Sequence, residues 1–416
     1  MSATAPRARE VQPRRRALGA LRHRNHRLLL GGLFVSGLGS WIQSLAQTWL
    51  MLRLTHSPLM VGAVLALQQL PALFVLPLAR PLAHSPHRRL LQAIQAVAAL
   101  PPLLLFAATA AQVVTPAAVL IAALAQGVVQ AAERPARQAL VLETVGRDDL
   151  VSAIRSGSTV GNLAAVAGPA VAGMLMSVAG LPSCFLANAV SALAVIATTA
   201  LIRDLPSLLG SGRDPGPLTA LAPAARYVRR DPIAGSMLLV AATLALFGTN
   251  RLTVLPLFAE EVLRVGPSGF GFLVAAVGLG NLAAGLALPL VPDRSGRRQL
   301  WTGLAWLLLL AGFASSRSLP LSIALLFLVG VCHGDFFSGV GARLQAATPE
   351  PLRGAVVTLY AQVLIGVGPL GAVQAGALAT LFGAPVAVAV GVGIAGLVVL
   401  AVWLLQPAAF TFELPD

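Results

Sequence analysis

The stretch that decides the fold class runs from Ser152 to Met174 and reads SAIRSGSTVGNLAAVAGPAVAGM. It is long enough to cross a bilayer, since about 20 residues at a rise of 1.5 Å per residue span the roughly 30 Å hydrocarbon layer. In water its glycines and proline would make a poor helix, but in lipid the backbone hydrogen bonds have no competitor. We therefore expect a membrane-spanning helix with closely packed neighbours and a bend after Gly168, so that it acts as a hinge. The hinge positions are Gly157, Gly161, Gly168, Pro169 and Gly173.

The overall composition extends this interpretation to the whole chain. Of the 416 residues, 57% are hydrophobic and only 11% are charged, whereas a soluble globular protein is about 25% charged. The net charge of +14 comes from arginine alone. A nucleic-acid-binding protein gathers its basic residues on one face, but here they fall in alternate loops. We therefore expect a lipid bilayer, and no nucleic acid, as the partner.

Eleven further hydrophobic runs meet the same length criterion, so the chain is expected to be an all-α membrane protein with about 12 transmembrane helices. They cover residues 28–52, 59–79, 90–111, 117–132, 184–202, 233–258, 270–292, 300–314, 319–341, 355–381 and 385–405. Together with the opening stretch these are twelve runs, and a polar segment divides the twelve into two sets of six. This predicts a basic tail at 1–27, an N-terminal six-helix bundle at 28–202, a linker at 203–232, a C-terminal six-helix bundle at 233–405 and a tail at 406–416.

The arginines between the runs follow the same alternation. The gaps after the even-numbered runs are rich in arginine, whereas the odd-numbered gaps hold only Arg53, Arg264 and Arg317. Cytoplasmic loops of membrane proteins carry this excess of positive charge. We therefore expect a multi-pass protein of the cell (inner or plasma) membrane with both termini in the cytoplasm.

The chain also repeats itself. Four residues reappear 209 positions later, and one dipeptide reappears 200 positions later: Gly39, Gly62, Arg88 and Arg89 match Gly248, Gly271, Arg297 and Arg298, and Gly168-Pro169 matches Gly368-Pro369. Two pseudo-symmetric six-helix halves are typical of a transporter whose substrate site lies near mid-membrane between the halves.

Residues 24–405 resemble the major facilitator superfamily, and within it the exporter branch typified by the enterobactin exporter. The resemblance rests on runs that include SWIQSLAQTWLMLRLTHSPLMVG, ERPARQALVLETV, ARYVRRDP and QAATPEPLRGAV. The fifth run resembles the antiporter motif of the superfamily at its hinge positions, with Ala172 in place of one glycine. This implies export against proton entry. The alternative is that the glycines only pack helices.

The loop motif of the superfamily, Gly-x-x-x-Asp-Arg-x-x-Arg-Arg, is incomplete here. The first copy keeps only Arg88 and Arg89, and the second keeps Asp293, Arg294, Arg297 and Arg298. Glu133 and Arg137 have the i, i+4 spacing of a helical ion pair. The resemblance places all eight residues in a cytoplasmic gate. The alternative for Glu133 and Arg137 is a solvated pair on the surface.

Polar side chains share one face on several of the runs and predict a substrate path. The candidates are Gln43, Gln47, Gln126, Gln130, Asn162, Arg251 and Gln362. A polar stripe facing lipid would be costly, so it is expected to line a wet cavity. The alternative for the amides is hydrogen bonding between packed helices, worth roughly 0.6 kcal/mol each. Arg251 would either meet an anionic substrate or extend outward to the membrane surface.

Asp335 is the strongest candidate for proton coupling because it is a carboxylate inside a span. A cap or latch at the membrane edge is the alternative for this residue. The sequence shows no phosphate-binding loop, metal-ligand cluster or arrangement of a catalytic nucleophile. We therefore expect no enzyme activity, no cofactor and no metal, and a transport step driven by an ion gradient or by the gradient of the substrate.

The sequence thus predicts a monomeric, proton-coupled exporter of a small organic molecule, siderophore-like or drug-like, that works by alternating access. Two alternatives remain open: a flippase for lysolipid-type amphiphiles, and a membrane partner or sensor that does not transport.

Overall fold

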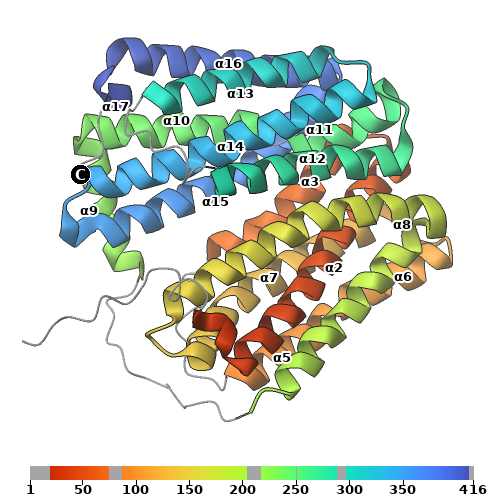
Figure 1. Cartoon of the computed structure of the whole chain (residues 1–416). Helices are drawn as coiled ribbons and strands as arrows, with labels where there is room; N and C mark the ends of the chain where they lie inside the picture. The colour runs from red at the N-terminus through yellow and green to blue at the C-terminus, as the bar shows by residue number, and fades with distance from the viewer. Residues whose placement is uncertain (1–18, 75–86, 204–216, 250, 288–296, 412–416) are drawn as a thin grey trace, which may run out of the picture.

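The protein is described from a computed structural model, which covers residues 19–74, 87–203, 217–249, 251–287 and 297–411. It is built from helices that gather into two groups (Figure 1). After the short turn η1 (Gly19–Arg22), the first group contains α2 (Arg24–Thr55), α3 (Pro58–Gln69) with η2 (Leu70–Phe74), α5 (His87–Ala98), α6 (Leu100–Ala110), α7 (Pro116–Val145) and α8 (Leu150–Ala200).

The second group follows the helix α9 (Pro217–Arg230), which lies between the two groups in the sequence. Its members are α10 (Pro232–Gly248), α11 (Arg251–Leu257), η3 (Phe258–Val262), α12 (Gly266–Ala287), α13 (Arg297–Ser315), α14 (Leu319–Ala347), η5 (Glu350–Leu352), α15 (Arg353–Phe382), α16 (Ala384–Leu405) and α17 (Ala408–Thr411). We call the two groups the first half and the second half.

Local sequence sets where several of these helices begin. The side chain of Thr115 accepts a hydrogen bond from the Ala118 amide at 3.2 Å, and that of Asp231 accepts one from the Ala234 amide at 2.8 Å. A proline follows each of these residues as the first helical residue. Proline suits that position, where its missing N–H would have had no partner.

The helix α8 supplies two membrane spans. Its 51 residues would be about 76 Å long at 1.5 Å per residue, far more than the roughly 30 Å of a bilayer core. The backbone leaves the helical region at Gly180, where φ is 79° and ψ is 170°. Only glycine adopts this conformation readily. The break therefore lies at Gly180, and the backbone dihedrals stay helical through Pro169, where the sequence predicted a bend.

The described helices confirm an all-α membrane protein. Within the described residues, nine helical stretches are long and apolar enough to cross a membrane, where α5 with α6 counts as one stretch and α10 with α11 and η3 as another. In the same part of the chain, counting the two limbs of α8 separately and adding the shorter apolar segment α3 with η2 and the 19-residue helix α13 gives twelve segments, the number that the sequence predicts.

The two halves meet through α8 against α12 and α3 against α15. Glycine permits this contact, because a Cβ added at Gly173 would lie 2.7 Å from the Pro267 carbonyl oxygen of the other half. A Cβ added at Gly376 would lie 2.6 Å from the oxygen of Pro58. The backbones therefore approach more closely than any side chain would allow.

Further contacts join the halves at the same end of the molecule, which we call the closed end. Trp49 stacks on Phe270 with ring centroids 5.8 Å apart, and Arg53 pairs with Glu260 at 3.3 Å. The buried apolar cluster around them draws residues from both halves.

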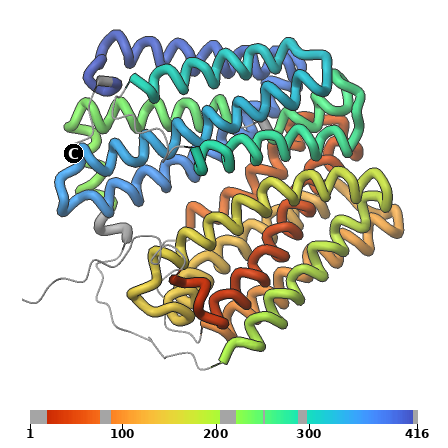
Figure 2. The backbone as a smooth tube through the Cα atoms, viewed as in Figure 1, coloured from red at the N-terminus to blue at the C-terminus, as the bar shows by residue number. Residues whose placement is uncertain are grey.

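The halves diverge toward the other end, which we call the basic end because it carries Arg24, Arg88, Arg137, Arg298 and Arg353 (Figure 2). Gly157 and Gly161 of α8 have no atom within 4 Å of the position that a Cβ would take. One helix therefore packs against the other half through its closed-end glycines and faces open space at its basic-end glycines.

A Gly173→Ala variant is expected to weaken the closed end, because the new methyl group would meet the backbone of α12. Overpacking costs about 1–3 kcal/mol, which changes a ratio of conformers by about 5- to 150-fold. Distances between spin labels at Arg147 and Gly354, exposed on opposite halves at the basic end, would report the shift. Gly161→Ala adds the same methyl group to the same helix in open space and should leave the distances unchanged. Equal distributions in the two variants would contradict the packing argument.

Candidate functional site

A cavity of about 920 Å³ lies along the basic-end portions of α2, α7 and α8. Its volume falls in the range of small-molecule sites. Apolar side chains alternate in its wall with polar ones, which include His26, Gln130, Glu133, Arg134, Ser158 and Asn162. The cavity can therefore accept a molecule that has both apolar and polar parts.

The structure places the predicted path residues in three different settings. Gln130 and Asn162 line the large cavity, as do the hinge glycines Gly157 and Gly161. Gln362 is half-buried on α15, away from this wall. The side chain of Arg251 lies outside the described residues.

Gln43, Gln47 and Gln126 bond to one another and to neighbours inside the first half. Gln43 donates to the Gln126 side-chain oxygen at 3.2 Å, and Gln68 donates to that of Gln47 at 2.7 Å. Asn188, on the second limb of α8, donates to the Gln43 oxygen. These bonds tie α2, α3, α7 and α8 together, which is the interhelical bonding that stood as the alternative for these amides.

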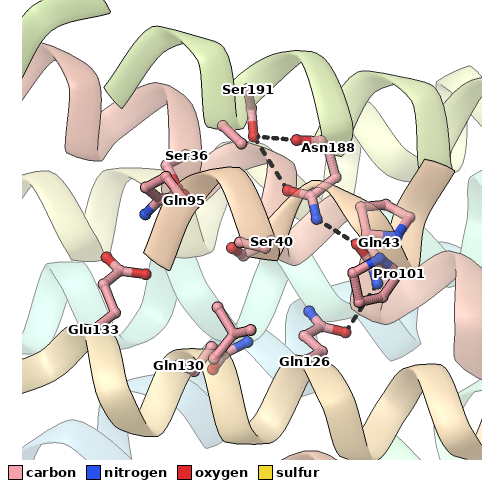
Figure 3. Close-up of a pocket in the computed structure, with 14 residues that line it drawn as sticks. Ser36, Ser40, Gln43, Gln95, Pro101, Gln126, Gln130, Glu133, Asn188 and Ser191 are labelled. Carbon is pink, nitrogen blue, oxygen red and sulfur yellow. Dashed lines mark hydrogen bonds between the residues drawn. The ribbon is translucent and has the colours of Figure 1, made fainter. Parts of the chain in front are cut away.

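A second, smaller cavity of about 30 Å³ adjoins this amide network (Figure 3). Its wall includes Gln43, Gln126 and Asn188 of the network, together with Gln95 of α5. It shares four polar residues with the large cavity: Ser36, Ser40, Gln130 and Glu133. The two cavities therefore have a common polar wall.

The sequence did not single out Gln95 or Asn188. Both are amide side chains inside apolar runs, and this is the signal that pointed to the other glutamines. Their role depends on how the third and sixth spans are rotated toward the first, which one chain's hydropathy does not specify.

The predicted gate residues, like the predicted path residues, are found in different settings. Arg137 pairs with Glu133 at 3.5 Å, and Arg88 donates to the Ile202 carbonyl oxygen at 2.9 Å. Arg89 and Arg297 are exposed. Asp293 and Arg294 lie outside the described residues.

Asp335 is bound by Arg298, which the sequence placed in the gate. Arg298 Nε donates to one carboxylate oxygen at 3.2 Å, and its Nη2 donates to the other. Thr302 adds a hydrogen bond at 2.9 Å. The Asp335 side chain is 8% exposed. This pairing of α13 with α14 favours the latch that stood as the alternative to proton coupling.

A buried pair that the sequence did not predict joins α5 to α7. His87 Nδ1 lies 2.7 Å from a Glu143 carboxylate oxygen, and both side chains are less than a tenth exposed. Their separation of 56 positions hides the pair from any local pattern. Within the described residues, no group of three or more histidine, cysteine or acidic side chains is arranged to hold a metal ion.

Asp335→Asn and Arg298→Gln are each expected to destabilise the protein, because either change leaves one buried charge without its main partner. Breaking a buried pair costs about 3–5 kcal/mol. The low end applies here because Arg298 is 21% exposed. Thermal unfolding in detergent micelles would measure the loss. The double variant should recover part of it, whereas strictly additive losses would argue that the two side chains are not coupled.

Comparison with known proteins agrees with this architecture. Residues 16–413 match the family model described as transmembrane secretion effector. The staphyloferrin A transporter of Staphylococcus aureus (strain NCTC 8325 / PS 47) is 26% identical over 262 residues, which are 62% of this chain and 65% of that protein. The match thus covers a little less than two thirds of that relative.

Two solved structures show the same fold. The nucleoside transporter NupG superposes with a TM-score of 0.71 at 17% identity, over 94% of this chain and 100% of that one. A bacterial homologue of the human lysosomal transporter Spinster, in an inward-facing and unoccupied conformation, also gives 0.71, at 14% identity over 96% and 98% of the two chains.

These proteins are transporters rather than enzymes. The family model covers nearly the whole chain, and the twelve spans form two six-helix bundles. The chain is therefore a multi-pass membrane transporter that belongs to the transmembrane secretion effector family of the major facilitator superfamily.

Proposed function

We propose that this transporter exports a small, partly polar organic molecule of the siderophore class in exchange for protons. The observation that carries the proposal is the 920 Å³ cavity between α2, α7 and α8, together with the packed closed end beyond it. A binding cavity open on one side and sealed on the other is one of the two states that alternating access requires.

The direction and the energy source follow from the sequence. Its arginine distribution supports a cytoplasmic location for the basic end, and with it for both termini, in a protein of the plasma membrane. The chain contains no lysine, so it has no phosphate-binding loop of the usual kind. An ion gradient or the gradient of the substrate itself is then the expected source, and the resemblance of the α8 glycines to the antiporter motif supports protons. The halves at 28–202 and 233–405, which the segment 203–232 joins in the sequence, rock about a central site.

Two features support the cargo class. The first is the similarity to a transporter named for staphyloferrin A. The second is the mixed wall of the cavity, where Arg134 and Arg137 bring positive charge beside the Glu133 carboxylate on a surface that is otherwise apolar or uncharged and polar. Such a wall suits a molecule that carries carboxylate or hydroxyl groups on an organic frame.

Metabolite profiling of the growth medium, with and without the gene, identifies the cargo. Uptake of that cargo into inverted membrane vesicles under an imposed pH gradient then tests the coupling. Accumulation that follows the gradient supports the proposal. Accumulation that depends on lipid composition and not on protons would favour a lysolipid flippase, and cargo binding without flux would favour a sensor.

A Gly161→Trp variant is expected to abolish this accumulation. Gly161 lines the cavity and has no atom within 4 Å of a Cβ position, so the indole can fill the cavity without displacing a helix. Gly285→Trp is the matched control, because Gly285 also has empty space around it but lies on α12, away from the lining. Equal transport by the two variants would exclude the cavity as the cargo route.

A further inference from the structure

The small cavity of the first half holds two buried donors that have no acceptor. The side-chain nitrogens of Gln95 and Gln126 make no hydrogen bond within the described part of the chain, and the two residues are 2% and 7% exposed. A buried amide left unsatisfied costs about 1–3 kcal/mol. Two such groups around one cavity therefore indicate that something polar fills it.

The space suits water. A cavity of about 30 Å³ exceeds the roughly 10–15 Å³ that one water needs. Water at this position accepts hydrogen bonds from both amides and keeps its own hydrogens to donate. The side chain of Glu133 lies on the wall shared with the large cavity, within the same group as Gln95 and Gln130 (Figure 3). Its carboxylate supplies an acceptor on this wall for a water in the small cavity.

Few charged groups face Glu133. On its own helix, Arg137 lies 3.5 Å away and is 41% exposed, and Arg134 lines the same large cavity. The titratable side chain that α2 presents to this cavity is that of His26. The helices α5 and α8 present uncharged polar residues there, namely Gln95, Ser158 and Asn162, and α6 presents prolines.

Asp335 provides the contrast, because both of its oxygens bind Arg298 and one also accepts from Thr302. The Glu133 side chain is 14% exposed, and its ion pair with Arg137 is a single contact at 3.5 Å rather than a two-point contact of the kind that Arg298 makes with Asp335.

We propose that Glu133, rather than Asp335, is the carboxylate that takes up and releases the coupled proton. This rests on the proposed proton-driven function. An O–H bond of a hydronium ion in the cavity water breaks and an O–H bond forms on a Glu133 oxygen, so that a neutral water is left, the charge on the carboxylate is lost, and the contact with Arg137 weakens. The reverse step returns the proton to water. Gln95 acts as a positioning residue, because its amide offers a donor to the charged form and, after rotation, an acceptor to the neutral form.

The test needs no cargo, since protons are the probe. Spin labels at Arg147 and Gly354 of the full chain in lipid nanodiscs report the distance between halves at the basic end as the pH is raised from about 5 to about 8. When Glu133 is unmodified, the distribution of distances between the two labels should depend on pH. Glu133→Gln should lose this pH dependence and show the low-pH distance distribution at every pH. Glu133→Asp should retain the pH dependence. Asp335→Asn should still respond to pH, and so should His26→Gln.

The outcomes separate the two proposals. If the protein with Glu133 intact does not respond to pH, proton coupling fails and this assignment fails with it. If that protein responds and Glu133→Gln responds equally, the assignment alone is overturned. A second readout guards against misfolding: the infrared carbonyl band of a protonated carboxylic acid should be present with Glu133, absent in Glu133→Gln and present in Asp335→Asn. Persistence of the band in Glu133→Gln would also overturn the assignment.

Discussion

The close approach of backbones between the halves is the constraint on which the structure depends. Lipid tails are as apolar as leucine, so helices in a membrane associate through packing and hydrogen bonds rather than through burial. Gly173 and Gly376 bring α8 against α12 and α3 against α15 at one end only. At the other end the same helix α8 carries glycines that touch nothing and line a cavity. The position of the contact therefore determines where the cavity can open.

The sequence predicted the fold because the fold depends on local composition and on the repeat. The matched positions Gly62 and Gly271 both fall on contacts between the halves, against Ala372 and Pro169. The ends of the helices were harder to predict from the sequence. The fourth run was expected at 117–132, whereas α7 continues to Val145 through Pro135, since polar residues do not end a helix that is packed on its neighbours. The break at Gly180 lies in an almost continuous apolar stretch, where hydropathy has no minimum.

The site was predicted only in part, because partners depend on helix rotation and on residues far apart in the chain. The polar faces of the first and fourth spans were recognised, but hydropathy did not distinguish Gln130, which lines a cavity, from Gln47, which is wholly buried in a hydrogen-bond network. The Asp335 and Arg298 pair joins residues 37 positions apart. The sequence singled out Asp335 and Arg298 separately, but it did not predict the contact between them.

The two carboxylates show how similar halves acquire different roles. Glu133 and Asp335 lie 202 positions apart, between the offsets of 200 and 209 that relate the halves. In the second half the neighbouring helix α13 supplies Arg298 to the carboxylate. In the first half the neighbouring helix α5 supplies Gln95, whose amide nitrogen is unpartnered within the described residues. An arginine holds the charge of a carboxylate fixed, whereas an amide can bond to either protonation state. Two environments that differ in this way separate the behaviour of two like groups, which is why the proposed proton site is Glu133 in the first half and not Asp335 in the second.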